Sequence, residues 1–115
     1  MDTATVKKAM EYKKAHLNLI QWALKQNCLI DIECKQDDTF NLKKSNNYEE
    51  IKKFFSDYDS DFNLYFYQNK LYKGWAVVIP YNYDEDTVSD YSANKFLDTW
   101  ANQFEKLTNG VKQCI

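Results

Sequence analysis

The chain of 115 residues contains no arginine, a single histidine, two glycines and one proline. Its fifteen basic residues are therefore all lysines. Because arginine makes the bidentate contacts that read guanine and phosphate, its absence counts against direct binding of nucleic acid. Two glycines are too few for a glycine-rich phosphate loop or a dinucleotide fingerprint, and we find no serine nucleophile elbow. The missing residues thus argue against several common enzyme classes.

Long apolar runs are also missing. The longest run, residues 75–79, is far shorter than the roughly 20 residues of a membrane-spanning helix. The first residues lack the apolar stretch of a signal peptide, and Cys28, Cys34 and Cys114 are odd in number. We therefore expect a cytoplasmic protein with reduced thiols and no contact with a membrane. A bridge between Cys28 and Cys34 is excluded because the two lie six residues apart on one expected strand.

Charge is present but unevenly distributed. Seventeen acidic side chains and fifteen lysines give a net charge of −2. Residues 1–55 carry 10 lysines and 8 acidic residues, whereas residues 56–115 carry 5 lysines and 9 acidic residues. The second half therefore predicts an acidic surface, which would speed encounter with a basic partner.

The pattern of apolar residues predicts a single domain over residues 1–115 of the α+β class, in the order α-β-β-α-β-β-α. We expect its four-stranded antiparallel sheet to be covered by helices. The expected elements are a helix over residues 4–27, a strand over 28–36, a return strand with Phe40 and Leu42, a short helix opened by a capping box at Asn47 and Glu50, a hairpin of 62–67 and 71–79 ended by Pro80, and a last helix capped by Thr87 or Ser89 and stopped at Asn109-Gly110.

The first expected helix has an unusually wide apolar arc. Its apolar residues spread over about 240° of the circumference, against a little over 100° for an ordinary surface helix. Such a helix needs a second partner beside the sheet. A homodimer through Tyr12, Leu19 and Trp22 is one arrangement; the alternative is that the last helix covers this side through Trp100 and Phe104.

Catalytic and metal-binding patterns are weak. Residues 57–61, Asp-Tyr-Asp-Ser-Asp, match the start of a calcium loop, but Phe62 stands where the loop needs glycine and Gln68 where it needs glutamate. We therefore interpret the segment as a solvated connection. His16 lies on an apolar helix without an acidic neighbour, which favours a histidine at the edge of the core over a general base. We predict no enzyme activity, no metal and no cofactor.

Aromatic residues, in contrast, are abundant. Nine tyrosines and seven phenylalanines exceed what one small core requires. Tyr65 and Tyr67 alternate with Phe62, Leu64 and Phe66 and so face the other side of their strand. They either cover the second face of the sheet beneath helices or belong to a protein interface, where tyrosine is enriched.

The best candidate for a binding site is the connection that follows Pro80. Surface connections carry function more often than core elements do, and this one holds several acidic residues and no lysine. An alternative is that Asp86 and Asp90 only favour the start of the following helix. We expect Asp57, Asp59 and Asp61 to extend the patch if their connection lies at the same edge of the sheet. The candidate partner-binding residues are Tyr81, Tyr83, Asp84, Glu85, Asp86, Asp90 and Tyr91, with Asp57, Asp59 and Asp61 as the extension.

Residues 74–82 read Gly-Trp-Ala-Val-Val-Ile-Pro-Tyr-Asn, and residues 86–92 read Asp-Thr-Val-Ser-Asp-Tyr-Ser. These segments resemble small proteins of phages and other mobile elements, a group that includes many anti-CRISPR proteins. The resemblance implies a short, catalytically inert cytoplasmic protein that occupies the nucleic-acid channel of a CRISPR effector as a DNA mimic. The element order is also similar to that of dimeric secretion chaperones, and the size and acidity to those of immunity proteins that neutralise nuclease toxins.

These observations predict a non-enzymatic, cytoplasmic inhibitor that binds a basic, nucleic-acid-handling defence effector through an acidic, tyrosine-rich surface. The partner is expected to be a protein and not nucleic acid itself. The alternative functions are a toxin-neutralising immunity protein and a dimeric binding module of the secretion-chaperone kind.

Overall fold

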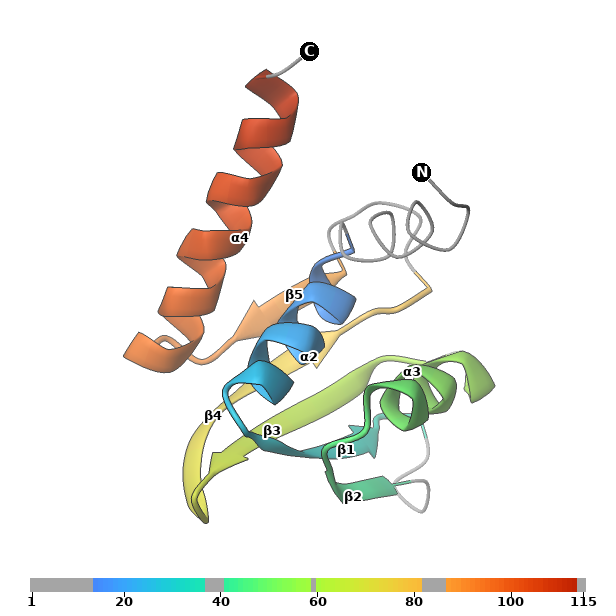
Figure 1. Ribbon diagram of the computed structural model, residues 1–115. Helices are drawn as coiled ribbons and strands as arrows, with labels where there is room; N and C mark the ends of the chain where they lie inside the picture. The colour runs from blue at the N-terminus through green and yellow to red at the C-terminus, as the bar shows by residue number, and fades with distance from the viewer. Residues whose placement is uncertain (1–13, 37–40, 59, 82–86, 114–115) are drawn as a thin grey trace.

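A computed structural model describes residues 14–36, 41–58, 60–81 and 87–113 (Figure 1). The α+β class is confirmed, but the sheet has five strands and not the four that were expected. In chain order the elements are α2 (Ala15–Lys25), β1 (Leu29–Cys34), β2 (Asn41–Ser45), α3 (Tyr48–Asp57), β3 (Phe62–Gln68), β4 (Leu71–Val78), β5 (Val88–Tyr91) and α4 (Lys95–Gln113).

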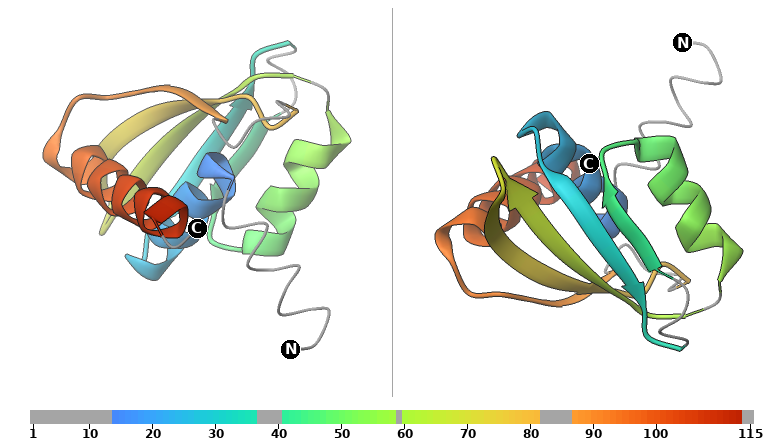
Figure 2. Two further views of the ribbon diagram at one scale, coloured as in Figure 1. Left: turned by 90° about the horizontal axis from the view of Figure 1, so that it is seen from above. Right: turned by 90° about the horizontal axis from the view of Figure 1, so that it is seen from below.

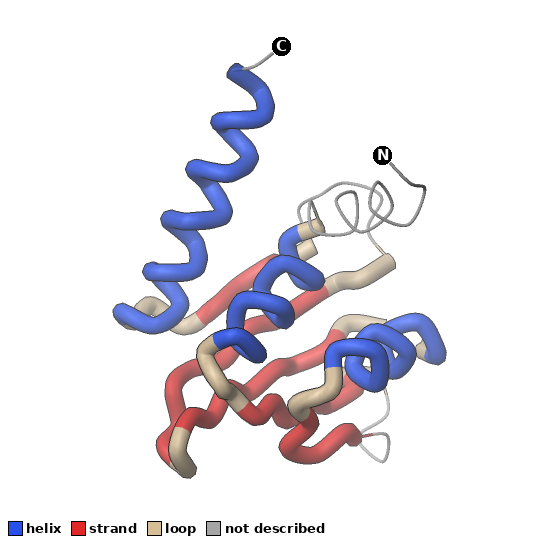
Figure 3. The backbone as a smooth tube through the Cα atoms, viewed as in Figure 1, coloured by secondary structure: helices blue, strands red, loops and turns tan. Residues whose placement is uncertain are grey.

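The sheet is antiparallel throughout, with the strand order β2-β1-β3-β4-β5. All three helices lie on one face of it, with α2 between α3 and α4 (Figure 2). The expected cover of helices is therefore confined to one face, and the other carries no helix within the described part of the chain. The C-terminal part of α4 extends well beyond the sheet (Figure 3).

The core lies between the sheet and the helices. Along β1 and β3 every second side chain is buried, as the period of two in a strand requires. The buried apolar side chains of the sheet are Ile30, Ile32, Cys34, Phe62, Leu64, Phe66, Ala76 and Val78, and those that cover them from the helices include Leu19, Ile20, Ala23, Ile51, Phe55, Leu97 and Trp100. None of the helices within the described residues is both long and apolar enough to cross a lipid bilayer.

Two local predictions are confirmed. At the start of α3 the Asn47 side chain accepts a hydrogen bond from the Glu50 amide at 3.0 Å. The Glu50 carboxylate accepts from the Ser45 hydroxyl at 2.8 Å, and this hydroxyl accepts from the Asn47 amide at 3.3 Å, so Ser45 closes the capping box. At the second hairpin Asn69 and Lys70 both have positive φ, as a two-residue type I′ turn requires.

The last helix begins later than expected. Residues Val88–Tyr91 form the edge strand β5, so the prediction that Thr87 or Ser89 caps α4 is wrong. Asn94 is the cap, because its side chain accepts from the Leu97 amide at 3.0 Å. The helix also continues through Asn109-Gly110 to Gln113. A glycine in a helix costs about 1 kcal/mol, which the rest of α4 tolerates.

The first helix is shorter than the predicted range of 4–27. Lys14 has an extended backbone, so α2 begins at Ala15, and residues 1–13, including Tyr12, lie outside the described residues. Its second side is covered by α4: the Trp100 indole donates to the Asn18 side chain at 2.9 Å, and the rings of Trp22 and Phe96 lie 4.8 Å apart. Leu19 is fully buried within one chain. The last helix thus covers this side through Trp100, as one of the two alternatives expected, and the homodimer stays a prediction.

Gly74 lets the corner between β5 and α4 approach the sheet. It has φ of +146°, and a Cβ atom there would lie 2.6 Å from Leu97 Cδ2 and 2.7 Å from Ser92 Oγ. The same corner is held by the Asn94 side chain, which donates to the Lys73 carbonyl at 2.9 Å. Glycine is thus required at position 74 for two reasons: other residues rarely adopt this φ, and there is no room for a Cβ atom.

We predict that Gly74→Ala lowers the free energy of unfolding by about 2 kcal/mol or more, because the added methyl group overpacks the corner and strains the backbone. Urea unfolding followed by circular dichroism measures the change. Gly110→Ala, the same substitution inside α4, is the control and is expected to be neutral or stabilising. Equal stability of the Gly74 variant and the parent would contradict the packing described for this corner.

Candidate functional site

The face of the sheet without helices is the most unusual surface of the molecule. Its side chains are defined by strand register, in three rows across the sheet, and we call it the open face. The rows are Leu29, Tyr67 and Tyr72; Asp31, Tyr65 and Trp75; and Asn41, Glu33, Asn63, Val77 and Asp90. Figure 2, seen from below, shows this face in front of the helices.

Four aromatic rings form a strip on the two strands β3 and β4. Tyr65 and Trp75 are direct cross-strand partners, and the rings of Tyr67 and Tyr72 meet edge to face with centroids 5.7 Å apart. A bulge at Lys73 shifts the register and places Tyr72 opposite Tyr67. Tyr72 is 53% exposed and the other three rings are half-buried. The strip therefore offers wide aromatic surface on strands that are paired on both sides.

Carboxylates flank the strip on β1 and β5. Asp31 accepts from the Lys44 amide at 2.6 Å, Glu33 from the Asn63 side chain at 3.0 Å, and Asp90 from the Tyr91 amide at 2.9 Å. Among the residues that the structure describes, no lysine lies within ion-pair distance of these three carboxylates. Their orientation is thus set by hydrogen bonds while their negative charge is left unpaired.

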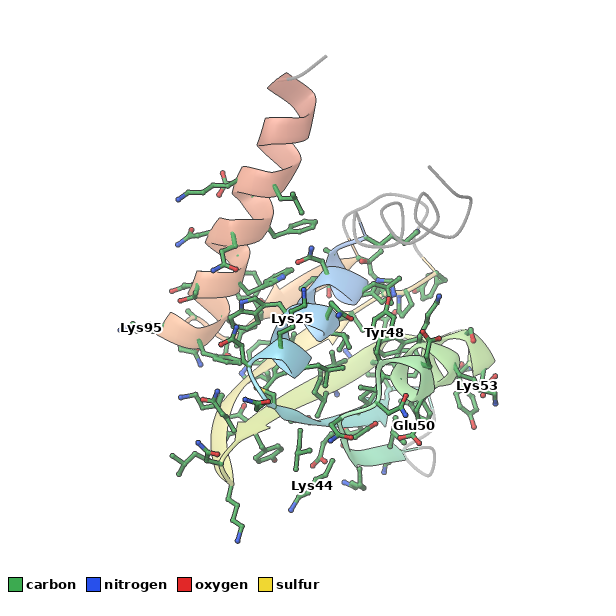
Figure 4. The ribbon with its side chains drawn as sticks, in the orientation of Figure 1. Lys25, Lys44, Tyr48, Glu50, Lys53 and Lys95 are labelled. Atoms are coloured by element: carbon green, nitrogen blue, oxygen red, sulfur yellow. The ribbon has the colours of Figure 1, made fainter. Side chains whose placement is uncertain are left out.

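Lysines border one side of the open face and also lie away from it. Lys43 and Lys44 of β2 lie opposite Asp31, where the register between β1 and β2 is irregular. Figure 4 shows Lys53 and Lys95 at the outer sides of α3 and α4, and Lys44 at the β2 edge. Burial and the nearby Glu33 carboxylate both raise the pKa of Tyr65, and burial together with the neighbouring tyrosines raises that of Tyr72. The phenols of Tyr65 and Tyr72 therefore stay neutral at physiological pH and add no charge to the open face.

The predicted site residues are divided among three places. The Tyr81 hydroxyl donates to Asp61 at 2.9 Å, because the pairing of Phe62 with Val78 brings the two connections to one edge of the sheet. Asp61 and Tyr81 are therefore neighbours, and Tyr81 is 57% exposed. Asp90 lies on the open face.

Two other residues lie on the helical side. Asp57 ends α3 and pairs with Lys53 at 3.3 Å, and the Tyr91 ring packs against Trp100 at 6.1 Å beneath α4. The residues Asp59, Tyr83, Asp84, Glu85 and Asp86 lie outside the described residues. The described members of the expected patch thus do not form one continuous surface.

The partner-binding residues predicted from the sequence did not include Asp31, Glu33, Tyr72 and Trp75. Alternation along residues 28–36 places Asp31 and Glu33 on one face of their strand, and two alternatives had been left open for Tyr65 and Tyr67. The missing information was which face the helices cover. That choice depends on contacts between segments far apart in the chain, and the alternation within a strand does not encode it.

His16 is buried at the start of α2. Its amide donates to the Thr87 hydroxyl at 2.8 Å, its Nδ1 lies 2.7 Å from the same oxygen, and its ring packs edge to face on Phe55. Burial, together with the positive charge of Lys14, lowers the pKa of His16 to about 4. The ring is therefore neutral at physiological pH, with Nδ1 directed at a hydroxyl that serves as the cap of a helix.

A groove of about 410 Å³ runs past His16 between α2 and α3. Its described lining residues include no carboxylate, and the hydroxyl of Ser56 among them donates to the Lys53 carbonyl at 2.9 Å. Cys28 and Cys34 are buried free thiols, and burial raises the pKa of Cys28. Within the described ranges no three potential metal ligands come together. Among the residues that the structure describes, the groove thus brings neither a free nucleophile nor an orienting acid to His16.

Comparisons with protein-family models, with curated proteins and with solved structures found no match to this chain.

We predict that Thr87→Val lowers the free energy of unfolding by about 2 kcal/mol, because the buried His16 amide and Nδ1 both lose their partner. Thr87→Ser keeps the hydroxyl and is expected to lose less. Thr99→Val, at an exposed position of α4, is the matched control. Chemical unfolding measures all three, and a Thr87→Val protein as stable as the Ser variant would argue against this cap.

Acidification tests the burial of His16. Its pKa is lowered from 6.5 to about 4, so the neutral ring stabilises the fold above pH 6.5 and this contribution is lost as the pH falls toward 4. The loss amounts to about 3 kcal/mol when complete. Unfolding free energies of the parent and His16→Gln, measured between pH 7.5 and 4, should therefore converge on acidification. A constant difference between the two proteins would show that His16 titrates normally.

Proposed function

We propose that this protein is a non-catalytic inhibitor whose open face binds a basic, nucleic-acid-handling protein and covers the site of its nucleic acid. One observation carries the proposal: a strip of Tyr and Trp rings lies on the face of the sheet that no described helix covers. The carboxylates of Asp31, Glu33 and Asp90, which form no ion pair with a described lysine, flank the strip. Such a surface combines negative charge, which speeds encounter with a basic partner, with aromatic rings, which supply affinity.

The carboxylates and the rings have different roles in this proposal. Unpaired charges accelerate encounter with a surface of opposite sign and select against acidic partners. Large rings that lose water on contact supply most of the affinity, as tyrosine and tryptophan do in the centres of protein interfaces. The rings occupy the middle of the open face and the carboxylates its flanks, which is the arrangement of an apolar centre with a polar rim.

Aromatic rings on a sheet are also typical of surfaces that bind single-stranded nucleic acid by stacking. Such surfaces combine the rings with a positively charged groove, because phosphates dominate the affinity. Here the groups beside the rings are carboxylates, which repel phosphate. The charge of the open face thus favours a protein that itself binds nucleic acid.

A CRISPR effector is the partner we propose first, because the chain resembles small anti-CRISPR proteins at residues 74–82 and 86–92. An immunity protein for a nuclease toxin would use the same surface in the same manner, so the identity of the captured partner separates the two. The dimeric secretion-chaperone alternative stays a prediction; one chain already buries Leu19 and packs Trp22 on α4.

The test neutralises the open face without removing its hydrogen bonds. In the triple variant Asp31→Asn, Glu33→Gln, Asp90→Asn, each side chain keeps an acceptor oxygen. The control triple, Glu49→Gln, Asp98→Asn, Glu105→Gln, makes the same charge change at exposed positions of α3 and α4. Immobilised parent and control are expected to retain the same protein from bacterial lysates. The open-face variant should bind that protein, once purified, at least about tenfold more weakly at low salt.

Inhibition is then measured directly. The purified partner is titrated with a fluorescent oligonucleotide, and a saturating amount of the parent protein is expected to prevent its binding. A partner that binds its oligonucleotide unchanged, or that is held equally by the open-face variant, would refute the proposed function. The triple reversal Asp84→Lys, Glu85→Lys, Asp86→Lys examines the 82–86 connection separately, and weaker binding by this variant would add it to the surface.

A further inference from the structure

We propose that the open face recognises arginine side chains, and that the segment docked on it is an arginine-rich stretch of the partner. This inference rests on the proposed function and names the chemistry of recognition at the same surface. It follows from how the rings and the carboxylates alternate across the strands.

By strand register, both central rings have residues with carboxylates as direct or diagonal neighbours. Asp31 is the direct cross-strand neighbour of Tyr65, and Glu33 is its diagonal neighbour. On the other side Asp90 pairs with Val77 and is therefore diagonal to Trp75. Direct neighbours in a sheet lie about 5 Å apart and diagonal neighbours about 7–8 Å, within reach of one bound side chain. The Glu33 carboxylate is close enough to Tyr65 to raise the pKa of its phenol.

A guanidinium group matches this arrangement better than an ammonium group does. It is planar and weakly hydrated, so it stacks on an aromatic ring while its N–H groups, which point outward in the same plane, bind a carboxylate at the side. Lysine carries a compact, strongly hydrated charge that gains less from a flat ring. A ring with a lateral carboxylate therefore discriminates between the two cations, which a carboxylate alone does only weakly.

The chain contains no arginine, so no guanidinium group of its own competes for these positions. A second copy of this chain is an unsuitable occupant for the same reason, and its open face would place carboxylates against carboxylates. A purely apolar partner would bury Asp31 and Glu33 without a counter-charge, at a cost that contact with the rings does not offset. Charge complementarity thus selects a cationic segment, and the rings select arginine.

The probes are fluorescein-labelled octaarginine and octalysine, which carry the same charge, and a labelled twelve-residue oligothymidine. Fluorescence anisotropy with the parent protein at 0.15 M salt is expected to show binding of octaarginine about tenfold tighter than that of octalysine. The oligothymidine is expected to bind more weakly than either peptide. Equal affinities for the two peptides, no binding of octaarginine, or tighter binding of the oligothymidine would each overturn the inference.

Two double variants test the contribution of the rings to the preference for arginine without changing the charge of the open face. The double variant Tyr65→Leu, Trp75→Leu should lose the preference for arginine and bind both peptides alike, whereas Tyr65→Phe, Trp75→Phe should retain it because the rings remain. Phe104→Leu, at a half-buried aromatic residue of α4, is the control away from the open face and should bind as the parent does. Thermal unfolding confirms that each variant is folded. A Leu variant that is folded and still prefers arginine would contradict the role of the rings.

The outcome is separable from that of the proposed function. If octaarginine is preferred while no nucleic-acid-handling protein is inhibited, the arginine site stands and the proposed function fails. If a partner is inhibited through the open face while the two peptides bind equally, the proposed function stands and the arginine site fails.

Discussion

The hydroxyl of Thr87 joins the start of α2 to the connection between β4 and β5. It accepts from the His16 amide and lies beside Nδ1 of the same residue, while the Thr87 carbonyl accepts from the Ile79 amide at 2.8 Å. The start of α2, the end of β4 and the approach to β5 therefore meet at one fully buried side chain. Because α2 is fixed between α3 and α4, all the helices stay on one face, and the aromatic face is left open.

One face of the sheet packs against the helices and the other carries the aromatic strip, so the core beneath the strands holds these binding side chains rigidly. Tyr65 and Trp75 belong to strands whose opposite faces carry Leu64, Phe66 and Ala76 in the core. The backbone beneath the rings is ordered before any partner arrives, so little entropy is lost there on association. A binding loop of the same composition would lack this advantage.

Local patterns predicted much of the fold, and distant contacts account for what they missed. Alternation in β3, the capping box at Asn47 and the hairpin of β3 and β4 depend on neighbours in sequence and are confirmed. The strand β5 has only four residues, and its identity depends on pairing with β4. Thr87 was predicted as a possible cap of the last helix. Its hydroxyl caps α2 instead, where it accepts from the amide of His16, 71 residues away in sequence. The side on which helices pack likewise decided whether Tyr65 is core or surface.

The outer edges of the sheet restrain aggregation. Strand β2 has an irregular register with β1, contains Lys43 and Lys44, and has a positive φ at Lys44, all of which oppose the addition of a further strand. At the other edge β5 is too short to serve as a long template. A protein with four aromatic rings on an open face is prone to self-association. Because its edge strands are irregular or short, they oppose the backbone pairing between chains that would lead to polymers.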